Sequence, residues 1–123
     1  MQIVDELTGN IIIRQGDDGQ YVVKDIPTDK NYLASFAVYT EDRKKINEMQ
    51  TQTDNKDFVE FTFPPSFTDE WVVKKGEEEA TYYFGIKLSY GLDEIEDTIV
   101  IGNKTIYDRN TITVLPKLVE GGV

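Results

Sequence analysis

The sequence contains neither cysteine nor histidine among its 123 residues. Without cysteine there is no disulfide framework and no thiolate nucleophile, which fits folding in a reducing cytosol. Without histidine the chain lacks the commonest general base, and the two absences together remove the usual nitrogen and sulfur ligands of zinc. Only Ser35, Ser66 and Ser89 offer a serine hydroxyl. None of them sits in a recognisable nucleophile motif, so a Ser–Lys dyad is the one nucleophilic arrangement left open.

The chain also lacks the features of membrane and nucleic-acid proteins. No apolar run approaches the roughly 18 residues of a membrane-spanning helix, and the start of the chain lacks the basic and apolar regions of a signal peptide. The 13 basic residues are outnumbered by 23 acidic ones, which gives a net charge of −10. Such a surface repels phosphate. We therefore expect no direct binding of membranes or nucleic acid, and the acidity favours solubility.

What remains is a globular composition with a strong β pattern. The hydrophobic fraction is 39% and the aromatic fraction 11%, enough for one folded domain over residues 1–123, with 119–123 as a frayed tail. In residues 80–90, "ATYYFGIKLSY", apolar side chains alternate, which predicts a long half-buried strand. Further strands are expected over 10–15, 20–26, 31–40, 58–63, 97–102, 104–108 and 110–115. This spacing predicts an all-β fold, a single antiparallel immunoglobulin-like β-sandwich of about seven to nine strands.

At most one short helix fits this pattern. Residues 66–75, "SFTDEWVVKK", have a capping residue, acidic residues near the start, lysines at the end and a following glycine. The charged segment 40–57 has few apolar residues, and we expect it to be an exposed, mobile loop.

Two acidic residues between glycines, Asp17 and Asp18 in "RQGDDGQYVV", pose the clearest chemical question. A calcium loop needs a bidentate glutamate at its twelfth position, and counting from Asp17 that position is Thr28. An Asp-Gly pair between two β-rich runs is instead typical of a hairpin turn, in which glycine supplies a positive φ. The motif is therefore predicted to turn the chain.

The clusters Glu77–Glu79 and Asp93–Asp97 receive a similar interpretation. Glycoside hydrolysis needs two carboxyl groups about 5 to 9 Å apart across a sugar. Both clusters fall at the ends of predicted strands, where solvated acidic loops are expected, and nothing in the sequence places them together. We predict no catalytic residues, no metal site and no cofactor.

The aromatic residues offer a binding hypothesis. Trp71, Tyr83 and Tyr90 could stack on sugar rings, although Trp71 also suits a plug at one end of the sandwich and Tyr90 the close of a core strand. Tyr83 falls on the face of its strand opposite the predicted core. Trp71 and Tyr83 are therefore the candidate interface residues.

A resemblance to a known family covers most of the chain. Residues 81–121 contain "YYFGIKL", "EDTIVIG" and "NTITVLPKLVEG", and the upstream part runs from "IIIRQGDDGQYVVKDI" to "NYLASFAVYTEDRKKI". With these pieces the chain resembles small β-sandwich proteins encoded in phages and prophages of gut and other low-GC Gram-positive bacteria. It is similar, more loosely, to the immunoglobulin-like N-terminal domain of the phage baseplate upper proteins.

The resemblance implies a non-enzymatic virion protein made in the bacterial cytoplasm. Its partners would be other virion proteins or further copies of itself, with no small-molecule ligand. Its place would be that of a baseplate or tail-fibre adaptor, or of a capsid decoration protein. Baseplate upper proteins continue into stalk regions whereas this sequence ends at Val123, which favours an accessory role. Two alternatives stay open: a carbohydrate-binding adhesion module, and an acidic phage-encoded inhibitor of a host enzyme.

Overall fold

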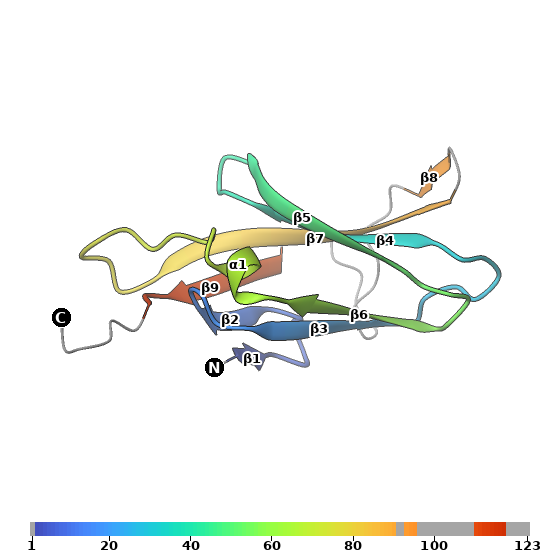
Figure 1. Ribbon diagram of the computed structural model, residues 1–123, viewed down its shortest axis with the longest axis horizontal. Helices are drawn as coiled ribbons and strands as arrows, with labels where there is room; N and C mark the ends of the chain where they lie inside the picture. Colours follow the sequence, from blue (N-terminus) through green and yellow to red (C-terminus); the bar gives the residue numbers. More distant parts are fainter. Residues whose placement is uncertain (1, 91–92, 96–109, 118–123) are drawn as a thin grey trace.

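The protein is an all-β sandwich, as the sequence predicts. The computed structural model describes residues 2–90, 93–95 and 110–117, and for 93–95 the backbone alone. The strands and the helix are β1 (Gln2–Val4), β2 (Ile11–Arg14), β3 (Gly19–Lys24), β4 (Leu33–Tyr39), β5 (Lys45–Gln52), β6 (Phe58–Phe63), α1 (Pro65–Thr68), β7 (Ala80–Tyr90), β8 (Asp93–Ile95) and β9 (Asn110–Leu115). Figure 1 shows how they form two layers, with β3 and β6 in one and the long strands β4 and β7 in the other.

The two sheets are very unequal in width. The large sheet has the order β1-β2-β9-β7-β4-β5, with β8 also paired to β7, and the small sheet contains, among the described residues, β3 and β6. Pairing is antiparallel except between β2 and β9, which run parallel, with Ile11 opposite Ile112. The second and the last described strands of the chain therefore meet inside the large sheet.

The alternation seen in the sequence becomes the inner and outer faces of these sheets. In β7, Phe84, Ile86 and Leu88 are buried, as the period of two predicts. The same holds in β6, where Val59, Phe61 and Phe63 face inward. Strand β4 lies between β5 and β7 and is buried along most of its length. Its apolar character on both faces is that of a central strand.

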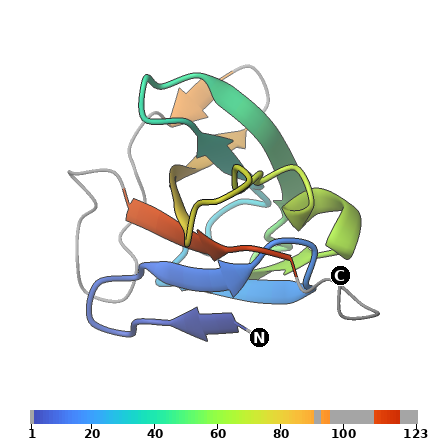
Figure 2. The same cartoon turned by 90° about the vertical axis from the view of Figure 1, so that its left-hand side faces the viewer.

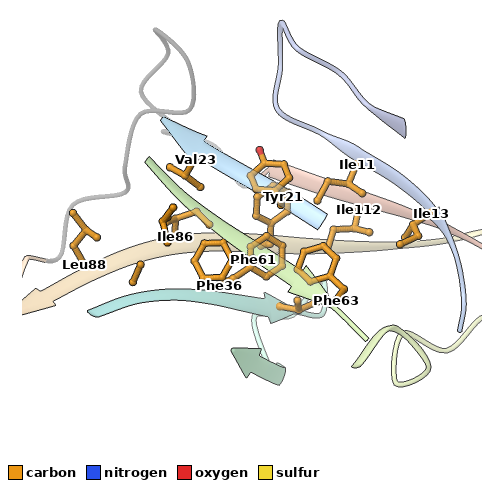
Figure 3. Close-up of a cluster of buried hydrophobic side chains, with 14 of the residues drawn as sticks. Ile11, Ile13, Tyr21, Val23, Phe36, Phe61, Phe63, Ile86, Leu88 and Ile112 are labelled. Atoms are coloured by element: carbon orange, nitrogen blue, oxygen red, sulfur yellow. The ribbon is translucent and has the colours of Figure 1, made fainter. Parts of the chain in front are cut away.

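An aromatic cluster joins the two layers. The ring of Phe36 in β4 lies 4.8 Å from that of Phe84 in the same sheet, measured between centroids. It also lies 4.9 Å from Phe63 and 5.5 Å from Phe61, both in the small sheet. Figure 3 shows Phe36, Phe61 and Phe63 together with Tyr21 between the strands. Such offset and tilted contacts are the favourable arrangements of aromatic rings.

The one short helix that the sequence predicts is present as a single turn, α1, which begins at Pro65, where proline's fixed φ suits the first turn, and Trp71 lies beyond its end. Two other expectations about local structure, the loop over 40–57 and the hairpin at residues 14–23, are wrong. The expected loop 40–57 contains the eight-residue strand β5, which pairs with β4 along its whole length. Strand β5 was not recognised in the sequence because it is an edge strand with few side chains to bury, and its composition is therefore polar.

The "QGDDGQ" motif turns the chain but makes no hairpin. Strand β2 pairs with β1 and β9, whereas β3 pairs with β6, so the motif carries the chain from one sheet to the other. Gly16 has the positive φ, +83°, while Gly19 begins strand β3. The carbonyl of Asp17 accepts a hydrogen bond from the hydroxyl of Thr68, which ties this crossing to α1. The predicted strands 97–102 and 104–108 and the predicted tail lie outside the described residues.

We expect Phe36→Ala to lower the free energy of unfolding by about 3–5 kcal/mol, because the change removes a fully buried ring that contacts both sheets. Urea denaturation followed by fluorescence measures this. Phe58→Ala is the matched control, since Phe58 is 44% exposed on the small sheet. An equal loss in the two variants would show that Phe36 has no special place in the core.

Candidate functional site: an open strand edge

Trp71 is a core residue and presents no surface to a partner. Its side chain is fully buried and packs at 5.7 Å against Phe63 and 5.6 Å against Phe67, between ring centroids. Its indole N–H donates to the side-chain oxygen of Asn47 over 3.1 Å. The expectation that Trp71 belongs to an interface does not fit this placement, whereas the alternative of a plug in the sandwich does.

Tyr83 lies apart from Trp71, on the outer face of the large sheet. It is opposite Tyr39 of β4 and Thr111 of β9, next to Gly85, above which there is open space. This agrees with the predicted outward direction of its side chain, and its role in an interface stays a prediction. Tyr90, by contrast, is 47% exposed and stacks edge-on against Tyr32, so it does not close the core.

The other motifs considered for chemistry are not brought together. Glu77–Glu79 are exposed ahead of β7, and Asp93–Ile95 form strand β8 instead of the expected loop. Ser35 is buried, and its hydroxyl oxygen accepts a hydrogen bond from the amide of Gln50. Within residues 2–90, 93–95 and 110–117, no three acidic, His or Cys residues are grouped to hold a metal ion. In the same ranges no helix is long and apolar enough to cross a membrane.

A groove of about 600 Å³ lies between β1 and β3. One side is formed by the end of β1 and the turn after it, the other by the outer side of β3. Its lining residues are Gln2, Val4, Asp5, Glu6, Gly9, Gln20, Tyr21, Val22 and Lys24. Figure 2 shows β1 beside β2 and β3 at the lower edge of the sandwich. The volume falls in the range of pockets that hold small ligands or short peptide segments.

The backbone of β3 presents hydrogen-bonding groups to this groove. In an antiparallel pair, the N–H and C=O of successive residues point alternately toward and away from the partner strand. Gln20 turns both groups away from β6, because its N–H and C=O bond the side chain of Gln2 at 2.8 and 2.7 Å. By the same alternation Val22 and Lys24 point their backbone groups into the groove. No described residue pairs with these two in the way that Gln2 pairs with Gln20.

Gln2 thus stands in for a neighbouring strand at one position. One N–H and the carbonyl oxygen of its primary amide bond Gln20, as the backbone N–H and C=O of an adjacent strand would. Gly19 makes the approach possible, since a Cβ there would lie 2.8 Å from the side-chain oxygen of Gln2. The second glycine of the "GDDG" motif therefore provides room, not an unusual φ.

A second contact fixes the floor of the groove. The buried hydroxyl of Tyr21 donates to the carbonyl of Gly9 over 2.8 Å, which joins β3 to the β1–β2 turn. Burial raises the pKa of Tyr21 well above its ordinary value, because the phenolate would lose its hydration. The hydrogen bond from Tyr32 to Asp29 raises the pKa of Tyr32, and burial raises that of Tyr82.

The edge strand at the opposite margin of the sandwich, β5, is protected against pairing with a further strand. Edge strand β5 contains a register shift opposite Val38 and Tyr39, and its exposed Lys45 and Glu48 form an ion pair. Irregular pairing and edge charges are common means of protecting a strand edge from further pairing. Strand β3 has an exposed valine, Val22, at the corresponding outward position.

Sequence reasoning missed Gln2, Gln20 and Val22 altogether. Which strand lies at an edge depends on topology, and nothing in the sequence reveals that β2 and β3 belong to different sheets. Within "QYVVK" the outward positions are held by Gln20, Val22 and Lys24, and a single apolar residue on a solvent face is too common to have marked the edge.

Comparison with known proteins supports the fold. No protein-family model matches the chain, and no curated protein matches it. Among solved structures it is similar to the periplasmic chaperone SfaE, with a TM-score of 0.51 and 14% sequence identity over 87% of this chain. The chain spans 54% of the length of that chaperone. The likeness confirms the immunoglobulin-like all-β sandwich.

Replacing Gln2 by alanine should expose the amide of Gln20. Loss of a hydrogen bond with a net contribution of about 0.5–1.5 kcal/mol predicts roughly 2- to 10-fold faster hydrogen exchange at that amide. NMR-detected exchange measures it, with the amides of Tyr21 and Val23 as internal references because they face β6. Ile3→Ala, at the next residue of β1, is the control variant. An unchanged rate at Gln20 would mean that Gln2 does not cover the edge in solution.

The free energy of unfolding should fall as the pH rises above 10. Unfolded tyrosines lose their protons near their ordinary pKa of 10.0, whereas the raised pKa keeps Tyr21 protonated in the folded state. Above that pH the unfolded state binds fewer protons, so alkali favours unfolding. Tyr21→Phe should reduce the steepness of the decline, while Phe58→Leu, an exposed substitution that removes no titratable group, should not. Urea titrations at several pH values test this, and equal slopes in all three proteins would contradict it.

Proposed function

We propose that the protein is a non-enzymatic structural subunit of a phage particle that acts by docking onto other virion proteins. The observation that carries the proposal is the open edge of β3 beside the groove. Backbone groups that are not paired within a sandwich are satisfied by water or by another chain, and an exposed edge is a common place for protein association. The resemblance to small phage β-sandwich proteins supplies the virion context.

The charge and the shape of the molecule suit this role. A net charge of −10 keeps an abundant subunit soluble before it is assembled. A particle carries many copies of its accessory proteins, so weak individual contacts add up to stable attachment. Positions as a baseplate or tail-fibre adaptor and as a capsid decoration protein both follow from docking of this kind.

A carbohydrate-binding role is less well supported. It was motivated by Trp71 and the tyrosines, and Trp71 lies in the core. Of the aromatic candidates, Tyr83 and the exposed Tyr90 remain, but their positions in β7 fall on opposite faces of the strand, so they do not form one sugar platform. No observation favours the alternative of an acidic enzyme inhibitor beyond the net charge itself.

The proposal predicts that the protein copurifies with virions in fixed stoichiometry. Phage particles induced from the strain that carries the gene would be banded twice in a density gradient and quantified by mass spectrometry against the major capsid protein. We expect several copies or more per particle, since decoration and baseplate subunits occur as symmetric sets. A host ribosomal protein measured in the same samples controls for contamination. A protein found in the lysate and absent from banded particles would overturn the proposal.

A further inference from the structure

The outward backbone groups of β3 that line the groove repeat at the spacing of an extended chain. Val22 and Lys24 are two residues apart in β3, which places their outward N–H and C=O groups about 6.6–6.8 Å apart along the strand. Only another extended chain presents donors and acceptors with the same repeat. A helix satisfies its own backbone groups, and a compact ligand has no such periodicity. Together with Gln20, now covered by Gln2, the edge offers three successive pairing positions.

The side chains around this edge define what the added strand must carry. Val22 is 37% exposed, and Val4 across the groove is 38% exposed, so one face of the added strand would gain from apolar residues. Asp5 and Glu6 line the groove, and Glu60 lies opposite Val22 in the register of β6. Lys24 is the single basic residue of the lining. The local excess of negative charge favours basic residues on the partner.

The same charge argues against a second copy of this chain as the occupant. Two molecules with a net charge of −10 each would have to bring their edges to the 4.7–4.9 Å spacing of paired strands. At that separation many of their charges lie within the Debye length of about 8 Å at physiological salt, so the repulsion is only partly screened. A different polypeptide of opposite charge meets no such obstacle.

We infer that the edge of β3 accepts an extended segment of another protein, in which apolar residues alternate with lysine or arginine, as an additional strand at Val22 and Lys24. Gln2 occupies the neighbouring pairing position, at Gln20. The added strand either displaces the side chain of Gln2 or ends its pairing there. The inference rests on the proposed docking function and names the surface and the partner chemistry that this function would use.

The test uses a displayed library of random ten-residue peptides, selected on the immobilised full chain at low salt. We expect the recovered peptides to alternate apolar and basic residues and to lack proline within the alternating stretch, because proline removes a ladder donor. On adding a recovered peptide, the amides of Val22 and Lys24 should become protected from hydrogen exchange, with little change at Tyr21 and Val23. Recovery of acidic peptides, of peptides that protect another surface, or of none would overturn the inference.

Two variants separate strand pairing from general attraction. Val22→Pro removes an outward N–H without touching the bonds to β6 and should weaken peptide binding about tenfold, whereas Val22→Thr keeps the N–H and should bind within about twofold of the wild type. Should Val22→Pro fail to fold, Glu6→Lys provides the second measurement. It should weaken binding at low salt, with Glu78→Lys, at an exposed position ahead of β7, as the charge-matched control. Wild-type affinity in Val22→Pro, or in Glu6→Lys where it alone can be measured, would overturn the inference.

These outcomes are distinct from those of the virion experiment. Peptide selection involves no particle, so absence of the protein from virions would remove the proposed function and leave strand pairing at β3 standing. A Val22→Pro protein that folds and is incorporated into particles at the wild-type level would remove the inference alone.

Discussion

The sandwich depends on one contact, the packing of Phe36 between the two sheets. Its ring meets Phe84 in its own sheet and Tyr21, Phe61 and Phe63 in the other. A pair of strands is at best marginally stable in water without a surface to cover it. In the part of the chain that the structure describes, the small sheet consists of β3 and β6. This pair depends on the large sheet, and the aromatic cluster attaches it.

The narrowness of the small sheet has a structural consequence at its margins. Every strand in a two-stranded sheet has one unpaired edge, and the outward backbone groups on that edge need another partner. In β3 the side chain of Gln2 supplies one for Gln20. It reaches no further, because a single amide has one carbonyl and one NH₂ group. The opening at Val22 and Lys24 therefore follows from how few strands cover the aromatic face, and not from any feature of those two residues alone.

The sequence predicts the elements much better than it predicts their arrangement. Residues 80–90 and 110–115 were predicted as strands with the bounds that the structure has, because alternation is a local property of the chain. Strand β5 was missed, since an edge strand buries little and its composition resembles that of a loop. The crossing between β2 and β3 was predicted as a hairpin because turn residues look alike whether they connect two paired strands or two sheets.

The candidate site could not be predicted for the same reason. The groove joins Gln2 to Gln20, which are 18 residues apart in sequence, through a contact that exists only because β1 lies at the margin of the large sheet. Trp71 shows the opposite error. Its rarity made it conspicuous in the sequence, yet the fold buries it against Phe67 of α1, and its indole N–H donates to Asn47. A conspicuous residue type indicates a recognition role only when the fold leaves it at the surface.

The open edge gives the acidity of the chain a second effect besides solubility, which is to oppose pairing between identical copies. An exposed edge with a valine at its centre is a template for any extended chain, including a second copy of the same protein. The acidic residues around the edge, Asp5, Glu6 and Glu60, oppose self-pairing, whereas they favour a partner of opposite charge. Distributing a net charge of −10 over the whole molecule opposes approach of identical copies while leaving the backbone groups of Val22 and Lys24 accessible. Solubility and selectivity for a basic partner are then two effects of the same surface.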